Sequence, residues 1–125
     1  MAINRLYGFK TMTFVGVFFV LLTAGLAQAG SAKPLAAPDG AAGADHNAEG
    51  IKHYNMRMWE KAEMHFREAA KENGKLAEAQ YNLALSLDKL GRHREATKHF
   101  ADAHKLGSDN PEIANSEILK KHLGM

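Results

Sequence analysis

The seven histidines of this chain, with the methionines near one of them, are the residues whose types best suit metal chemistry. His65 and His99 lie 34 residues apart, at equivalent places in an internal repeat. We expect them on neighbouring helices about 10 Å apart, too far to share an ion unless their side chains reach toward each other. Met56, Met58 and Met64 beside His65 would supply thioether ligands of the kind that copper accepts.

The other histidines weaken the metal hypothesis. His53 stands where the second copy of the repeat has the core residue Leu87, so we predict that it packs against its neighbours. His93 and His104 are predicted on the solvated surface. His99 and His104 are five residues apart on one helix, which is a poor ligand spacing. We therefore predict no metal site, and a copper- or zinc-binding protein remains an alternative.

The sequence carries no recognisable catalytic motif. No serine stands in a nucleophile elbow, no HExxH pair is present, and the glycines form no phosphate-binding loop. The chain has no cysteine, which excludes a disulfide scaffold, a thiolate metal site, a haem attachment motif and a cysteine nucleophile. We expect a protein that is not an enzyme and needs no cofactor.

Residues 1–29 have the pattern of an export signal. Arg5 and Lys10 precede an uncharged, mostly apolar run over residues 11–27, and Ala27-Gln28-Ala29 has the spacing of a cleavage site. The run is 17 residues long, whereas a spanning helix needs about 20. We expect cleavage after Ala29 and a periplasmic or secreted protein. A retained segment that anchors the chain to the inner membrane is the alternative.

Cleavage would change the charge of the chain. Of its 16 basic residues, Arg5 and Lys10 would be lost, which leaves 14 against 14 acidic residues. A body near zero charge lacks the field that attracts nucleic acid or acidic lipid, so we expect neither as a partner. Residues 30–44 are rich in alanine, glycine and proline, with Leu35 as the only large apolar side chain, and are predicted to form a flexible linker.

The rest of the chain, residues 45–125, contains a repeat of 34 residues. The small and aromatic residues of one copy recur in the next: Ala62, Phe66 and Ala69, then Ala96, Phe100 and Ala103. A fixed period of this length is typical of helical repeat arrays. With Leu83-Ala84 and Gly91, these residues resemble the tetratricopeptide repeat (TPR), a helix-turn-helix unit. Arg57 departs from the pattern, because it stands where the first copy should have its turn glycine.

The resemblance implies an all-α fold of the α-solenoid type, with two TPR-like repeats at about 43–76 and 77–110 and a C-terminal capping helix. Helices are expected over residues 45–56, 59–72, 77–90, 93–106 and 111–123. Asn110 is a candidate N-cap for the last of these, and Pro111 suits its first turn. Lys120, Lys121 and His122 suit the negative end of its dipole.

First helices of such repeats line the concave side of the superhelix. The resemblance therefore implies a partner-binding groove lined by Asn47, Ile51, Tyr54, Asn55, Tyr81, Leu85, Asp88, Lys89, Asn115, Leu119 and His122.

Within this groove, Tyr81, Leu85 and Asp88 share one face of their helix, opposite the predicted core residues Leu83 and Leu87. The alternative is that Tyr54 and Tyr81 pack on each other or on the cap. The basic side chains with which some family members hold a C-terminal carboxylate are mostly absent, and only Asn82 and Lys89 stand at suitable places.

The sequence thus predicts a non-enzymatic protein–protein interaction or scaffold module that binds a partner peptide or helix in its groove. Contact with a membrane is expected only if residues 1–29 are retained. Two alternatives remain, a periplasmic metal-binding protein and a self-associating structural unit, since fewer than three repeats bury little core.

Overall fold

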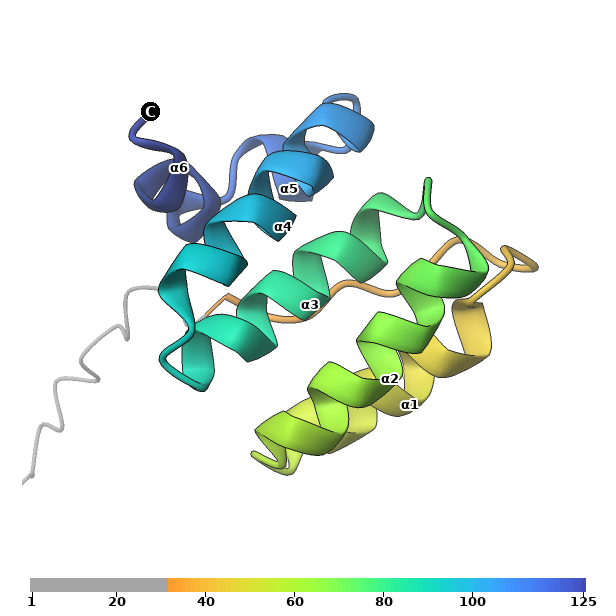
Figure 1. Ribbon diagram of the computed structural model, residues 1–125. Coiled ribbons are helices and arrows are strands. Elements are labelled where there is room, and N and C mark those ends of the chain that lie inside the picture. Colours follow the sequence, from red (N-terminus) through yellow and green to blue (C-terminus); the bar gives the residue numbers. More distant parts are fainter. Residues whose placement is uncertain (1–31) are drawn as a thin grey trace, which may run out of the picture.

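The computed structural model describes residues 32–125, and within this range every regular element is a helix (Figure 1). The predicted signal segment, residues 1–29, lies outside the described residues. The helices are α1 (Ala44–Asn55), α2 (Trp59–Glu72), α3 (Ala77–Lys89), α4 (His93–Leu106), α5 (Pro111–Ala114) and α6 (Glu117–Leu123). None of these helices is both long enough and apolar enough to cross a membrane.

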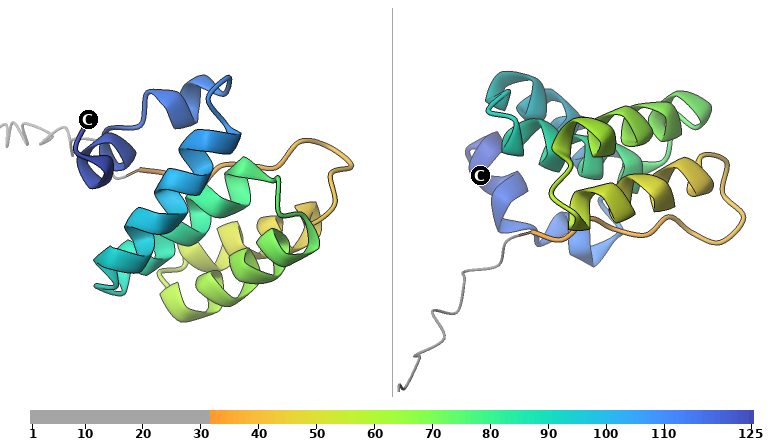
Figure 2. Two further views of the ribbon diagram at one scale, coloured as in Figure 1. Left: turned by 45° about the horizontal axis from the view of Figure 1, so that its top comes forward. Right: turned by 90° about the horizontal axis from the view of Figure 1, so that it is seen from below.

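The first four helices form two hairpins that pack side by side. α1 packs against α2, α2 against α3, and α3 against α4, so each helix contacts the next along the chain. The short helices α5 and α6 pack on α4 (Figures 1 and 2). The first four of the five predicted helix spans are confirmed to within one residue at each end.

The turns of the two hairpins have the same backbone conformation. Arg57, between α1 and α2, has a φ of 59°, and Gly91, between α3 and α4, has a φ of 76°. Both values lie in the left-handed region, which glycine adopts without steric cost and other residues rarely adopt. Arg57 therefore carries backbone strain at the position where the second hairpin has its glycine.

The repeated small and aromatic residues form the core between the helices. Ala62, Phe66 and Ala69 of α2 are fully buried, as are their counterparts in α4. Phe66 lies against α1 at Gly50, where an added Cβ would stand 2.4 Å from the ring. A small residue at this place is thus required by the close approach of the two helices.

The predicted capping helix over residues 111–123 is interrupted, which corrects the expectation of one continuous helix. α5 ends at Ala114, and Ser116 starts α6 by accepting a hydrogen bond at its hydroxyl from the backbone N–H of Leu119. Side chains of this kind compete with helical backbone bonds and favour caps. The N-cap at Asn110 is confirmed, because its side chain accepts a hydrogen bond from the N–H of Glu112.

Part of the predicted flexible linker packs against the helices. Residues 32–38, here called the strap, run in extended conformation along α1 and α3, opposite in direction to both (Figure 1; Figure 2, right). Ala32 and Leu35 pack against the main core, and Ala37 packs against a smaller cluster around Ala69. The small number of large apolar side chains in this segment predicts a flexible linker. Composition gives no information on hydrogen bonds to the backbone, and such bonds hold the strap in place.

Candidate functional site

Two asparagines hold the backbone of the strap at Leu35. The N–H of Leu35 donates to Asn82 Oδ1 at 2.7 Å, and its carbonyl oxygen accepts from Asn82 Nδ2 at 2.7 Å. The same carbonyl accepts from Asn47 Nδ2 at 2.9 Å. Asn47 comes from α1 and Asn82 from α3, so the strap is fixed to both hairpins at a single residue.

The two asparagines also bond to each other. Asn82 Nδ2 donates to Asn47 Oδ1 at 2.8 Å, and both side chains are fully buried. Buried amide groups are costly unless they are hydrogen-bonded. Without the strap, Asn82 Oδ1 would lose the donor that the strap supplies to it, so the hydrogen bonding of this buried amide depends on the backbone of Leu35.

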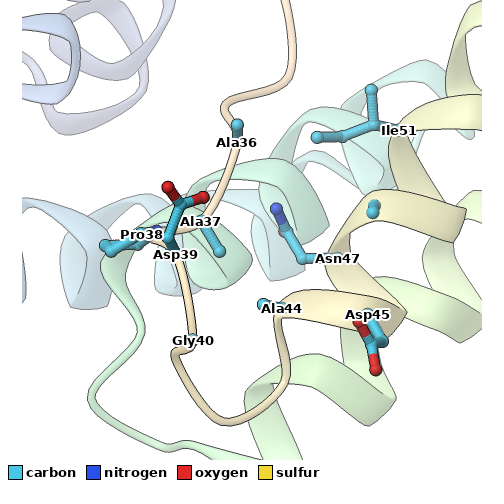
Figure 3. A pocket seen from close by; sticks show the side chains of 10 residues that line it. Ala36, Ala37, Pro38, Asp39, Gly40, Ala44, Asp45, Asn47 and Ile51 are labelled. Atoms are coloured by element: carbon cyan, nitrogen blue, oxygen red, sulfur yellow. The ribbon is translucent and has the colours of Figure 1, made fainter.

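The strap leaves a pocket beside these bonds. Residues 36–40 of the chain form one wall and the N-terminal half of α1 forms the other (Figure 3). The side chains of Asn47 and Ile51 reach from α1 toward the extended segment. At the opposite end, Ala32, Lys33 and Pro34 border a second hollow with Trp59.

Five of the predicted groove residues are buried and do not line an open groove, which corrects the sequence interpretation. They are Asn47, Tyr54, Tyr81, Leu85 and Leu119. Leu85 is part of the main core together with Leu83 and Leu87, although it lies on the other side of the helix. The reason is that α3 is covered on several sides at once, by α2, α4 and the strap.

The two tyrosines of this set serve the core. The hydroxyl of Tyr81 is 2.8 Å from Ser116 Oγ, and its ring meets Phe100 edge to face at a centroid distance of 5.7 Å. The ring of Tyr54 packs on Trp59, with centroids 4.9 Å apart. Burial raises the pKa of Tyr54 to about 12, with smaller contributions from Tyr81 and Asp88. Burial likewise raises the pKa of Tyr81. Both stay neutral phenols at physiological pH.

The remaining predicted groove residues are partly or fully exposed. Ile51, Asp88 and His122 are half-buried, while Asn55, Lys89 and Asn115 are exposed. Lys89 Nζ lies over the ring of Trp59 at 5.8 Å from its centroid. Asp88 and His122 meet, with Oδ1 and Nε2 2.9 Å apart. The structure thus brings together only part of the predicted set.

The histidines at equivalent repeat positions take different partners. His65 stacks on His53 with ring centroids 5.1 Å apart, and its Nδ1 lies 3.4 Å from His46 Nδ1. His99 Nδ1 instead lies 2.8 Å from Gln80 Oε1. His53 is half-buried, in agreement with the packed position predicted for it. The rings of His53 and His65 are nearly parallel, at 11°.

The sequence interpretation missed the role of Asn82 and of Leu35. From the sequence, Asn82 is a candidate only for a carboxylate contact, and Leu35 is only the one large side chain of the predicted linker. A usable signal was present, because asparagine is a poor helix former and stands here among apolar residues in the middle of a helix. Such a residue is usually held there by a buried hydrogen bond.

Comparison of this chain with known protein families, with curated proteins and with solved structures finds no match.

Proposed function

We propose that this protein is a non-enzymatic interaction module of the bacterial periplasm, and that the face formed by α1 and α3 holds an extended peptide segment of a partner protein. The proposal includes a TPR-like repeat array and export through residues 1–29. The 34-residue sequence period and the two stacked helical hairpins support the array. One observation carries the functional proposal: buried Asn82 bonds both the N–H and the carbonyl oxygen of Leu35.

The chemistry of this contact defines the ligand. Hydrogen bonds to a peptide N–H and carbonyl accept any residue type except proline, which has no N–H, so they recognise extended backbone and not a particular side chain. Any preference of the face for particular side chains comes from the surroundings of Leu35. The Leu35 side chain packs on the core, and its neighbours in the chain, Pro34 and Ala36, are small. The partner segment is therefore extended, with one apolar residue flanked by small ones.

The strap then acts as an intramolecular competitor. It is joined to α1 by a short turn at residues 39–43, so its effective concentration at the face is high, on the order of millimolar for a short flexible connection. A partner segment must displace it, which lowers the apparent affinity of the face for that segment. Weakening the strap should accordingly strengthen partner binding.

A labelled peptide with the sequence of residues 30–40 tests this directly. Replacing Leu35 by Asp in the protein removes the apolar contact of the strap, and we expect this variant to bind the peptide more tightly than the unchanged protein. Adding Asn82→Ala to that variant should abolish the gain. Lys52→Ala, an exposed change on α1 outside both hollows beside the strap, is the matched control and should have no effect.

Trp59 gives a second readout, because it is the only tryptophan of the chain and borders the hollow formed by residues 32–34. Displacement of the strap should shift its fluorescence. Equal peptide affinity with and without Asn82 would contradict the proposal. A concentration-dependent dimer in light scattering, lost on Leu35→Asp, would instead favour exchange of straps between two copies and a self-associating unit.

A further inference from the structure

Asp88, His93 and His122 come together at the edge of the second hairpin although they belong to three different helices. Asp88 lies in the last turn of α3, His93 opens α4, and His122 lies in the last turn of α6. Asp88 Oδ1 is 2.7 Å from His93 Nδ1 and 2.9 Å from His122 Nε2. One potential ligand atom from each residue lies within 4.8 Å of the other two.

Both ring nitrogens of His122 have a polar neighbour, Thr97 at Nδ1 and Asp88 at Nε2. Thr97 donates its hydroxyl hydrogen to the backbone carbonyl of His93 at 2.9 Å. The Thr97 oxygen also lies 2.9 Å from His122 Nδ1, where it can accept a hydrogen bond from that nitrogen. A neutral histidine has only one N–H. In the tautomer with its proton on Nδ1, the Nε2 atom of His122 presents its lone pair on the side of Asp88.

In that tautomer the lone pair of His122 Nε2 and the carboxylate of Asp88 face the same small space, with Nε2 and Oδ1 2.9 Å apart. His93 Nδ1, 2.7 Å from the same carboxylate oxygen, borders this space as well. The ring of His122 is held in this orientation by Phe100, with centroids 4.8 Å apart, and its side chain is only 12% exposed. A metal-bound histidine whose other nitrogen donates to an oxygen is the usual arrangement in metal sites.

We propose that Asp88, His93 and His122 form a binding site for a zinc-type divalent metal ion. Two imidazoles and one carboxylate are accepted zinc ligands, with bonds of about 2.0–2.2 Å, and leave a fourth tetrahedral position for water. His93 is 67% exposed and lies at the start of its helix, so its side chain can adjust to the ion. The site opens to solvent through a pocket that Ile118 and the exposed Lys121 complete.

The ion would join the C-terminal helix to the second hairpin. α6 contacts the body mainly through α4, and the metal would add a bond from α6 to the end of α3. Because only the folded chain brings the three ligands together, zinc binding stabilises the folded state. This site is separate from the strap and does not depend on the proposed peptide binding.

Calorimetric titration of the purified protein with zinc chloride tests the proposal, with one ion bound per chain as the expected result. His93→Gln changes an exposed side chain and Asp88→Asn keeps its shape, and each should weaken binding at least ~10-fold. Thr97→Val removes the partner of His122 Nδ1, and we expect it to weaken binding by about 10–100-fold. His65→Gln, in the other histidine cluster, is the control and should leave zinc affinity unchanged.

Cobalt(II) in place of zinc provides a spectroscopic check. A tetrahedral site gives intense visible absorption, which His93→Gln should remove while circular dichroism shows the fold intact. Absence of saturable zinc binding would overturn the proposal. So would unchanged affinity in both His93→Gln and Asp88→Asn, or loss of binding in His65→Gln, which would assign the ion to the other histidines.

Discussion

The ring of Phe66 in α2 occupies the space that a side chain at Gly50 of α1 would need, since a Cβ there would lie 2.4 Å from the ring. In the second hairpin the corresponding residue is Ala84, with Phe100 as the aromatic partner. The first hairpin is therefore packed more closely at this crossing. Glycine at position 50 permits this close approach, although alanine would have the higher helix propensity there.

Replacing Gly50 by Ala should destabilise the protein. Alanine is favoured over glycine in a helix by about 1 kcal/mol, but overpacking a filled core costs ~1–3 kcal/mol or more. We therefore expect a lower free energy of unfolding for Gly50→Ala, measured by urea denaturation. Gly74→Ala is the control, because nothing lies within 4 Å of a Cβ at that position. If Gly50→Ala melts later than the unchanged protein, the packing of Phe66 described above is incorrect.

Replacing Arg57 by Gly should stabilise the protein. Arg57 is exposed and has a φ of 59°, and the left-handed conformation costs a residue with a Cβ about 1–2 kcal/mol. Part of this gain is offset by the greater freedom of glycine in the unfolded chain, so we expect a net gain of ~0.5–1 kcal/mol. The reverse change, Gly91→Arg, should destabilise by a similar amount. Thermal melts of the two variants should move in opposite directions.

Tyr81 should behave as a core residue. Tyr81→Ala removes a buried ring and should cost ~3–5 kcal/mol in unfolding free energy, comparable with Leu83→Ala. Tyr81→Phe keeps the ring and loses only the bond to Ser116, at a cost of ~0.5–1.5 kcal/mol. Urea unfolding separates these cases. A Tyr81→Ala variant as stable as the unchanged protein would contradict the core position of Tyr81 and favour the open groove predicted from the sequence.

Stability should fall on acidification. Burial is the main cause that lowers the pKa of His65. Repulsion from His53 and His46 lowers this pKa further, whereas the negative charge of Glu49 raises it in part. The folded state therefore binds a proton at His65 less readily than the unfolded state does. Above the ordinary histidine pKa of about 6.5 neither state is protonated and stability is complete. As the pH falls through that value, protonation favours the unfolded chain.

Burial also lowers the pKa of His99, with a further contribution from Arg67, so it acts in the same direction. Urea midpoints measured between about pH 7.5 and 5.5 should decrease, and His65→Gln should reduce the decrease. Combining His65→Gln with His99→Gln should reduce it further. An increase in stability over this pH range would contradict the assigned directions.

Much of the fold follows from the sequence alone, because the signals that define a helix are local. The spacing of Ala62, Phe66 and Ala69 defines one buried stripe on α2, and the same spacing defines one on α4. Asn110 and Pro111 indicate where α5 begins. Each of these helices has one covered face, so periodicity identifies that face correctly.

The sequence did not determine the surroundings of α3. Residues 81–87 of this helix are all buried, so its apolar and polar residues form no single stripe from which a groove could be read. The buried amide of Asn82 finds its partners in Asn47 and in the strap, whose Leu35 is 47 positions away. The composition of a segment does not show whether its backbone is hydrogen-bonded to the rest of the protein. For this reason the sequence predicts a flexible linker where the structure has the strap.

Contacts between charged residues also divide into those that the sequence predicts and those that only the tertiary structure brings about. The pairing of Glu63 with Arg67 could be predicted, because residues four apart on a helix are neighbours. Arg92 joins Glu63 at 2.8 Å only because the second hairpin packs beside the first. Likewise Asp88 and His122, 34 residues apart, meet because α6 folds back over α4. Helix propensity and periodicity act over a few residues, whereas the asparagine pair and the proposed metal ligands depend on how whole helices pack.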